Sequence, residues 1–461
     1  MRDLLTRIVN LAKEKFDAEY AEARAQKLFK TMLTIKEEKV EAAREGVETG
    51  VAIRVLVDGA WGFASVGATK TELLFDSLSD ACKMAKAASL KLKHPIKLVE
   101  YKSFEDKVKV KPRKNPTQFL IEDKITTTST IAKTVLGFDR RIKSCTIDYL
   151  DIFGTNYFVN SEGTCIEQDK LYVWSRITAA AREADVLTFS REEVGLTAGY
   201  EIFDVETPEI LGERVAKRAV EQLRAKLPKG GRFEAVLGPN VVGVFVHEAF
   251  GHLAEADLTL SGSVLIDKLG KRIASEVVEI YDDGTIDGAF GSFKYDDEGV
   301  PAQRTLLVKG GVVVGLMHNR ETASKFNVEP TGNARAEDFR VEPIIRMRNT
   351  FMAPQDYTFE ELIEDIKFGY YFKSFRGGQA NLDGTFQVGI QEAYEIVKGE
   401  IADPVRNASI SGNTLETLHK VDAVGRDFEL WPGRCGKGQT AFICDGGPHI
   451  RVKEVLVGGI A

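Results

Sequence analysis

The apolar positions near the N-terminus predict a helix, a β-hairpin and a second helix, in that order. Residues 3–16 repeat apolar side chains at the spacing of one helix face, at Leu4, Leu5, Ile8 and Leu11. The stretch 50–66 is apolar on both sides of Asp58-Gly59, and this dipeptide predicts a hairpin because both turn positions need a positive φ. The second helix is expected over residues 71–88, with a buried face of Leu73, Leu74, Leu78, Ala81 and Met84.

Residues 91–117 interrupt this pattern, because they are rich in lysine and contain three prolines. We interpret them as a solvated crossing between elements and as a candidate domain boundary. Several short β-type runs follow over residues 142–197. A helix is then expected to begin at Thr207-Pro208 and to end at the Pro-Lys-Gly-Gly stretch 228–231. Its apolar face repeats every four residues, at Leu211, Val215, Ala219, Leu223 and Leu227.

These patterns together predict an α+β fold in three parts. The parts are an N-terminal α/β region over residues 1–110, a β-rich middle segment over 111–230 that ends in a helix, and a sheet-rich C-terminal domain over 231–461. The C-terminal part is rich in glycine and in strand-forming residues, and we expect few long helices in it.

The composition suits a soluble globular protein and argues against several other classes. The chain has 461 residues, with 62 Lys and Arg against 69 Asp and Glu, and its net charge of −7 argues against general binding of nucleic acid or anionic membranes. We do not expect the charged N-terminus to act as a signal peptide, and no apolar run approaches the roughly 20 residues that span a bilayer. The 5 cysteines are scattered without a CxxC pair, which favours a reducing compartment, so we expect a cytoplasmic protein.

The strongest functional signal is the stretch 239–257, PNVVGVFVHEAFGHLAEAD, which contains an HExxxH pattern. It uses two of the 6 histidines, His247 and His252, after an apolar run typical of a buried helix. Two neutral imidazoles are good Zn²⁺ ligands, and a catalytic zinc site needs a third protein ligand and an open position for water. Glu248 is the carboxylate placed to take a proton from that water. The alternative is that both histidines are ordinary helix residues, one buried and one exposed.

The spacing of the two histidines sets a structural requirement. On a regular α-helix, residues i and i+5 are about 500° apart in rotation, which leaves the two rings about 140° apart. His247 and His252 therefore reach one metal only if the helix bulges or unwinds between them. We expect the break at Gly251, directly before His252, because glycine has the greatest backbone freedom.

A third ligand has to come from elsewhere in the chain. The candidates are Glu255, Asp257, His318, His449, Cys435 and Cys444. Cys435 lies in WPGRCGKGQT between Arg434 and Lys437, and these cations favour the thiolate form that binds metals. A phosphate-binding role for this glycine-rich loop is disfavoured, because no Ser or Thr follows the lysine. Cys444 lies in the strand-like run AFICDG and is expected to belong to the core.

The chain resembles the TldD/PmbA metalloproteases, once called modulators of DNA gyrase, and is closest to the TldD-type subunit that bears HExxxH. The matching stretches include HEAFGHLAEAD at 247–257, EPTGNARAEDFRVEPIIRMRNTFM at 329–352 and GRCGKGQ at 433–439, together with residues 278–323 and the terminal VKEVLVGG. The resemblance implies a zinc-dependent peptidase whose metal is held by the two motif histidines and a C-terminal cysteine. In this chain these residues are His247, His252 and Cys435, with Glu248 as the catalytic carboxylate.

The resemblance also implies substrates and partners. Small or unfolded peptides would reach an enclosed site at a dimer interface and add to a sheet edge as an extended strand. The expected reaction is hydrolysis of a peptide bond by zinc-assisted attack of water, and the partner is either a second copy or a PmbA-like subunit. Glu255 and Asp257 also match the family pattern, and we expect them to support the site through hydrogen bonds.

Two alternative functions remain open at this stage. One is a non-catalytic regulator that binds another protein, as the older gyrase-modulator name suggests. The other is a structural metal site or a different type of zinc hydrolase.

Overall fold

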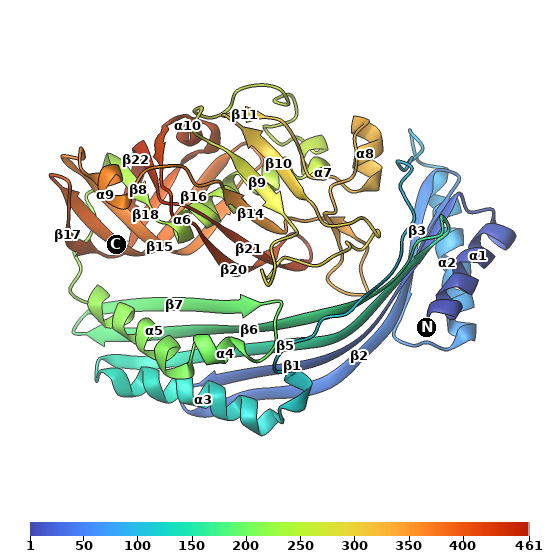
Figure 1. The fold of residues 1–461 in the computed structure, drawn as a ribbon, viewed down its shortest axis with the longest axis horizontal. Helices are drawn as coiled ribbons and strands as arrows, with labels where there is room; N and C mark the ends of the chain where they lie inside the picture. Colours follow the sequence, from blue (N-terminus) through green and yellow to red (C-terminus); the bar gives the residue numbers. More distant parts are fainter. Residues whose placement is uncertain (460–461) are drawn as a thin grey trace.

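The computed structural model describes residues 1–459, and its N-terminal part is one long, curved sheet (Figure 1). The seven strands have the order β3-β2-β1-β5-β6-β4, with β7 paired to β6. Neighbouring strands are antiparallel except β4 and β6, which are parallel. Their bounds are β1 (Tyr20–Lys36), β2 (Lys39–Val57), β3 (Ala60–Val66), β4 (Glu105–Val108), β5 (Ile142–Asn160), β6 (Cys165–Glu183) and β7 (Val186–Leu196).

The pairing of β1 with β5 joins the first two predicted parts of the chain. The register runs from Glu22 opposite Asn160 to Lys36 opposite Thr146, so the N-terminal region and the middle segment share one sheet. The division into 1–110, 111–230 and 231–461 stays a prediction. The sequence analysis does not predict β1, because its first seven residues, which are all buried, alternate alanine with Tyr, Glu, Arg and Gln, and alanine and glutamate are poor strand formers.

The predicted helices α1 (Arg2–Phe16) and α2 (Thr71–Ser89) are confirmed, as is the hairpin, whose Asp58 and Gly59 have φ of 51° and 69°. The predicted face of α2 needs correction, because Leu73 and Met84 are exposed. Its buried side chains are Leu74, Leu78, Ala81, Cys82 and Ala85.

The helix predicted after residue 207 is α5 (Pro208–Gln222), and its start is confirmed. The Thr207 hydroxyl accepts a hydrogen bond from the Ile210 N–H, with Pro208 at the first helical position. The predicted end is wrong, because the helix stops at Gln222 and Leu227 lies exposed beyond it. A short helix, α4 (Ile202–Val205), precedes α5.

A long helix, α3 (Ile121–Phe138), lies in the segment that the sequence predicts to be β-rich, and it follows a short 3₁₀ turn, η1 (Pro116–Gln118). Its buried face begins with polar residues and becomes apolar only in its second half, which weakens the helical pattern. The Lys124 ammonium is buried against the sheet, 2.7 Å from the Asp151 carboxylate. Helices α3 and α5 cover the outer face of the curved sheet at one end, and α1 and α2 lie at the other end (Figure 1).

The C-terminal part contains two larger sheets, which confirms an α+β fold with a sheet-rich C-terminal region. The first has the order β15-β8-β22-β18-β16-β17, and an additional β15–β16 pairing closes five of its strands into a ring. Its strands are β8 (Gly231–Leu237), β15 (Phe368–Ala380), β16 (Thr385–Val397), β17 (Glu400–Val405), β18 (Ala408–Asn413) and β22 (Ile450–Gly459), with β19 (Val421–Val424) paired to β22.

The second C-terminal sheet has the order β11-β10-β9-β14-β21-β20 and ends in β20 as an edge strand. Its strands are β9 (Ile280–Asp283), β10 (Arg304–Lys309), β11 (Val312–Val313), β14 (Asn349–Met352), β20 (Glu429–Gly436) and β21 (Thr440–Gly447), and β12 (Ala334–Arg335) pairs with β13 (Ile344–Ile345) nearby. The helices are short, as predicted: α6 (Pro239–Val244), α7 (Ala256–Leu260), α8 (Arg320–Phe326), α9 (Phe359–Ile363) and α10 (Thr414–His419).

The segment that carries the HExxxH pattern packs inside the C-terminal part. Val241, Val242, Phe245, Val246 and Phe250 are buried in one core cluster with side chains from both of its large sheets. Strand β20 lies close to β7, the edge strand of the long N-terminal sheet, without pairing with it. No helix within residues 1–459 is long and apolar enough to cross a membrane.

Candidate metal centre

The helix that carries the two histidines changes its geometry within the motif. It begins as α6 with Pro239 at its first position, continues as a π-helix over Phe245–Gly251, and ends in a 3₁₀ turn over His252–Ala254. The N–H of His252 donates to the carbonyl oxygen of His247, which is the i to i+5 bond of a π-helix. The bulge that the five-residue spacing requires is therefore confirmed.

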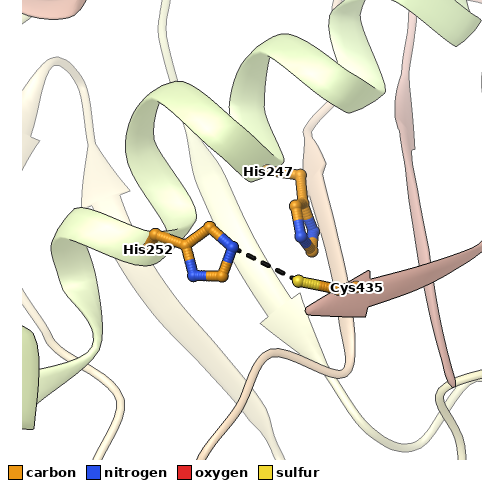
Figure 2. A group of neighbouring side chains, drawn as sticks. All are labelled: His247, His252 and Cys435. Atoms are coloured by element: carbon orange, nitrogen blue, oxygen red, sulfur yellow. Dashed lines mark hydrogen bonds between the residues drawn. The ribbon is translucent and has the colours of Figure 1, made fainter. Parts of the chain in front are cut away.

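Because of the bulge, the imidazole rings of His247 and His252 lie on the same side of the helix and face the side chain of Cys435 (Figure 2). The ring centroids of His247 and His252 are 5.1 Å apart, and the rings are nearly perpendicular, at 82°. The Sγ of Cys435, on the edge strand β20, lies 3.2 Å from Nε2 of His252. One donor atom from each of the three side chains lies within 4.8 Å of the other two, and no other such group of His, Cys, Asp or Glu occurs in residues 1–459.

Gly251 contributes to this arrangement through packing rather than through backbone freedom. Its φ of −56° and ψ of −48° are ordinary helical values, which any residue can adopt. A Cβ at this position would overlap the sulfur of Met347, a buried residue that packs directly against the helix. The expectation that the helix breaks at this glycine is therefore wrong, because the extra residue is absorbed by the whole π-helical turn.

The residues fit a bound cation, as the hydrogen bonding of His247 indicates. Both nitrogens of this buried ring lack a hydrogen-bond partner within residues 1–459. Buried polar atoms without a partner are rare in folded proteins, and each costs about 1–3 kcal/mol of stability. Coordination of a metal by one nitrogen would remove part of this cost. Two imidazoles and a thiolate are also a donor set that Zn²⁺ prefers.

The three side chains shift one another's pKa values strongly. Burial alone would raise the pKa of the Cys435 thiol, but the positive charges of His247 and His252 outweigh it and lower this pKa to about 4. Burial would lower the pKa of His252, yet its hydrogen bonds with Cys435 and Glu255 raise it to about 10. The cysteine is thus held as a thiolate, the form that binds metals.

The cause of the thiolate differs from the one that the sequence predicts. Arg434 stacks over the Trp174 ring at 5.1 Å, and Lys437 binds carboxylates, so neither of these cations is the source of the shift at Cys435. The Lys437 ammonium lies 2.7 Å from Asp257 and 3.2 Å from Glu255. This pairing also leaves the glycine-rich loop without a free lysine for a phosphate group.

Glu255 orients one of the histidines. Its carboxylate is fully buried and lies 2.9 Å from Nδ1 of His252, which directs Nε2 of the same ring toward Cys435. A carboxylate on the second ring nitrogen is the usual way to hold a metal-binding histidine in one orientation. Glu255 and Asp257 thus make the supporting hydrogen bonds and ion pairs that the sequence analysis expects of them.

The remaining third-ligand candidates lie elsewhere in the fold. His318 is buried, with Nδ1 bonded to Thr322, and burial lowers its pKa to about 4. Both ring nitrogens of His449 are occupied, by Asp427 at 2.7 Å and by the Tyr371 hydroxyl at 2.9 Å. Cys444 is a core residue, as expected, and its sulfur accepts a hydrogen bond from a backbone N–H.

A cavity of about 220 Å³ opens onto the histidine–cysteine cluster. Its wall includes Glu248, whose carboxylate is 4.0 Å from Nε2 of His252, and two glycines of β15, Gly377 and Gly378. Asp445 also lines it, and burial raises the pKa of this carboxyl group to about 7. The sequence analysis missed Asp445, although a single acid after the apolar run AFIC is an available signal.

Comparisons with known proteins cover nearly the whole length of the chain. Residues 21–89, 114–223 and 230–459 match the first, central and C-terminal domains of the PmbA/TldA metallopeptidases. A protein of Methanothermobacter thermautotrophicus named a metalloprotease is 42% identical, with 96% of each chain covered. A protein of Saccharolobus solfataricus named a zinc metalloprotease TldD homolog is 36% identical, over 97% of this chain and 98% of the relative.

Solved structures share the fold at lower sequence identity. A Thermotoga maritima protein described as a candidate modulator of DNA gyrase superposes with a TM-score of 0.80 at 22% identity, over 99% of each chain. TldE from Thermococcus kodakarensis superposes with a TM-score of 0.78 at 21% identity, over 99% of this chain and all of the other. The chain therefore belongs to the TldD/PmbA family of metallopeptidases, as a TldD-type member.

Proposed function

We propose that the chain is a zinc-dependent peptidase that hydrolyses peptide bonds in small or unfolded peptides. The observation that carries this proposal is the convergence of three donor atoms, from His247, His252 and Cys435, at a cavity whose wall includes the carboxylate of Glu248. Membership of a metallopeptidase family supports the reaction, and the name of the Saccharolobus relative supports zinc as the metal.

In this proposal His247, His252 and Cys435 hold the metal. When bound, Zn²⁺ supplies a Lewis acid that polarises a peptide carbonyl and lowers the pKa of a water molecule to about 7. Glu248 takes a proton from the water as its oxygen attacks the carbonyl carbon, and it delivers that proton to the leaving amine nitrogen as the C–N bond breaks. The products are one peptide with a new carboxyl group and one with a new amino group.

The free edge of β20 supports the choice of an extended peptide as substrate. This strand pairs only with β21, and it carries Cys435, so a peptide aligned with it passes the cluster. Main-chain hydrogen bonds to a sheet edge recognise peptides with little dependence on sequence. The proposed partner is a second copy or a PmbA-like subunit, and the structural similarity to TldE supports the second choice.

Removal of the metal tests this proposal. Dialysis of the protein against a strong chelator is expected to abolish cleavage of unfolded casein, because Glu248 alone does not polarise the carbonyl. Addition of one equivalent of Zn²⁺ should restore cleavage, as followed by mass spectrometry of the products together with metal analysis. Cleavage at the original rate by a chain with no detectable metal would contradict a metallopeptidase.

Glu255→Gln should weaken zinc binding without removing a ligand. Loss of a hydrogen-bonded carboxylate behind a metal-binding histidine typically lowers metal affinity by about 10–100-fold. The measurement is competition for Zn²⁺ between the protein and a fluorescent chelator. Glu416→Gln, at an exposed glutamate on α10, is the matched control and should bind zinc as the original protein does. Equal affinities in the two variants would rule out a supporting role for Glu255.

A further inference from the structure

A second, larger cavity lies next to the one that contains the histidine–cysteine cluster. Its volume is about 740 Å³, and it lies between the end of β7 and the beginning of β20. Glu192, Glu193, Trp431 and Pro432 line both cavities, so the two form one continuous groove along β20. We call the part formed by the second cavity the β7–β20 groove.

The β7–β20 groove has an apolar floor that is open to solvent. The side chains that line it include Leu196, Val205, Ile286 and Leu430, and Val205 is 74% exposed. Apolar side chains gathered in an exposed groove mark a binding surface more often than scattered ones do. Trp431, on the wall shared with the metal cavity, has a buried Nε1–H without an acceptor in residues 1–459, and a peptide carbonyl is a suitable acceptor.

The rim of the groove is acidic. The groove is lined by two arginines, Arg113 and Arg214, and by a larger number of carboxylates. The six carboxylates are those of Glu192, Glu193, Glu201, Glu206, Asp287 and Glu429. Four of the six are already engaged, in ion pairs with arginines or, at Glu201, in hydrogen bonds from backbone N–H groups. Asp287 and Glu429 are exposed and make no ion pair within residues 1–459, which leaves two negative charges available to a ligand.

We propose that the β7–β20 groove binds the substrate chain at a distance from the cleaved bond and selects an apolar side chain next to a cationic one. This inference rests on the proposed peptidase function. Glu429 precedes Cys435 by six positions on β20, and a strand rises about 3.4 Å per residue, so the selected pair lies about 20 Å from the metal. Continuity with the metal cavity favours a substrate chain over a second copy of the protein as the occupant.

Peptide binding to the Glu248→Gln variant tests the groove without requiring cleavage. The probes are fluorescein-labelled dodecapeptides of Ala, Ser and Gly that carry Leu-Lys or Leu-Glu near one end, made in N-terminal and C-terminal versions. With the pair at one of the two ends, the variant should bind the Leu-Lys peptide about tenfold more tightly than the Leu-Glu peptide. The reason is that the two unpaired carboxylates, Asp287 and Glu429, attract the lysine ammonium and repel the glutamate carboxylate. The measurement is fluorescence anisotropy at low salt.

Charge reversal of the rim should remove this preference. In the Glu248→Gln background, Asp287→Lys with Glu429→Lys is expected to bring the two affinities to within twofold or to invert their order. Glu276→Lys with Glu416→Lys, at two exposed acids outside the groove, should leave the tenfold preference intact. Val205→Asn should weaken binding of Leu-Lys about threefold more than binding of Ala-Lys, because it removes apolar contact area.

The outcomes separate this inference from the peptidase function. If the Glu248→Gln protein shows no preference while the original protein cleaves casein, the groove proposal fails and the peptidase function stands. If the preference is present but the original protein cleaves nothing, the peptidase function fails, and the groove is a peptide-binding site with no role in selecting a substrate. If charge reversal changes the molecular mass in light scattering without changing peptide binding, the groove is an interface between copies and the proposal is overturned.

Discussion

Glu248→Gln is expected to lower kcat for peptide cleavage by about 10²–10⁴-fold, the usual contribution of a positioned general base. The amide keeps the size of the side chain, but it does not accept the proton of the attacking water. Zinc content should remain at one ion per chain, because Glu248 lies outside the group of three donors. The measurements are initial rates on unfolded casein and metal analysis of the same preparation.

The matched control for this prediction is Glu416→Gln, which replaces an exposed glutamate on α10 and should cleave at the original rate. Unchanged cleavage by Glu248→Gln would remove this residue from the mechanism. The regulator alternative makes a different prediction, namely that the original protein and the variant act equally on a bound partner without cleaving it. These two outcomes therefore distinguish a peptidase with a different base from a protein that is not a peptidase.

Cys435→Ser is expected to remove most of the zinc. A serine hydroxyl is not ionised at neutral pH, whereas the Cys435 thiol, with its pKa of about 4, supplies a thiolate. The loss of affinity should exceed the roughly 10–100-fold that follows from loss of a hydrogen-bonded partner such as Glu255. The measurement is zinc per chain after dialysis, with affinity from chelator competition, and cleavage should fall in proportion to the zinc lost.

Cys165→Ser is the control for a general effect of cysteine removal, because Cys165 lies on β6 and belongs to no group of candidate ligands within residues 1–459. It should retain zinc and activity. Full zinc retention by Cys435→Ser would instead assign the third position to a different donor. Glu255 would be the first to consider, since its Oε1 is buried and has no hydrogen-bond partner in residues 1–459.

Local patterns in the sequence predict much of this protein because they report local structure. The Asp58-Gly59 turn and the Thr207 cap depend on a few neighbouring residues, and both are found as predicted. The five-residue spacing of His247 and His252 predicts a helical bulge from geometry alone, and the π-helix confirms it. The sequence does not predict where the bulge lies. Gly251 is the expected site of the break, but its role is to leave room for the side chain of Met347.

Features that depend on distant segments could not be read from the sequence. Cys435 lies 183 residues after His252, and no spacing rule relates them, so its choice over the other candidates depends on the family resemblance. The charges that hold its thiolate come from the histidines across that gap rather than from its neighbours in the chain. Helix α3 escaped prediction for a related reason, because its polar Lys124 is buried only through its pairing with Asp151 of β5, which no helical pattern reports.

The most direct test of the account is an anomalous difference map from crystals of the purified protein, measured above and below the zinc absorption edge. The account predicts one peak per chain, present only above the edge, within bonding distance of Cys435 Sγ, His252 Nε2 and one nitrogen of His247, at the roughly 2.0–2.3 Å expected for zinc ligands. A peak bound by other residues, or no peak in protein that metal analysis shows to contain zinc, would contradict it.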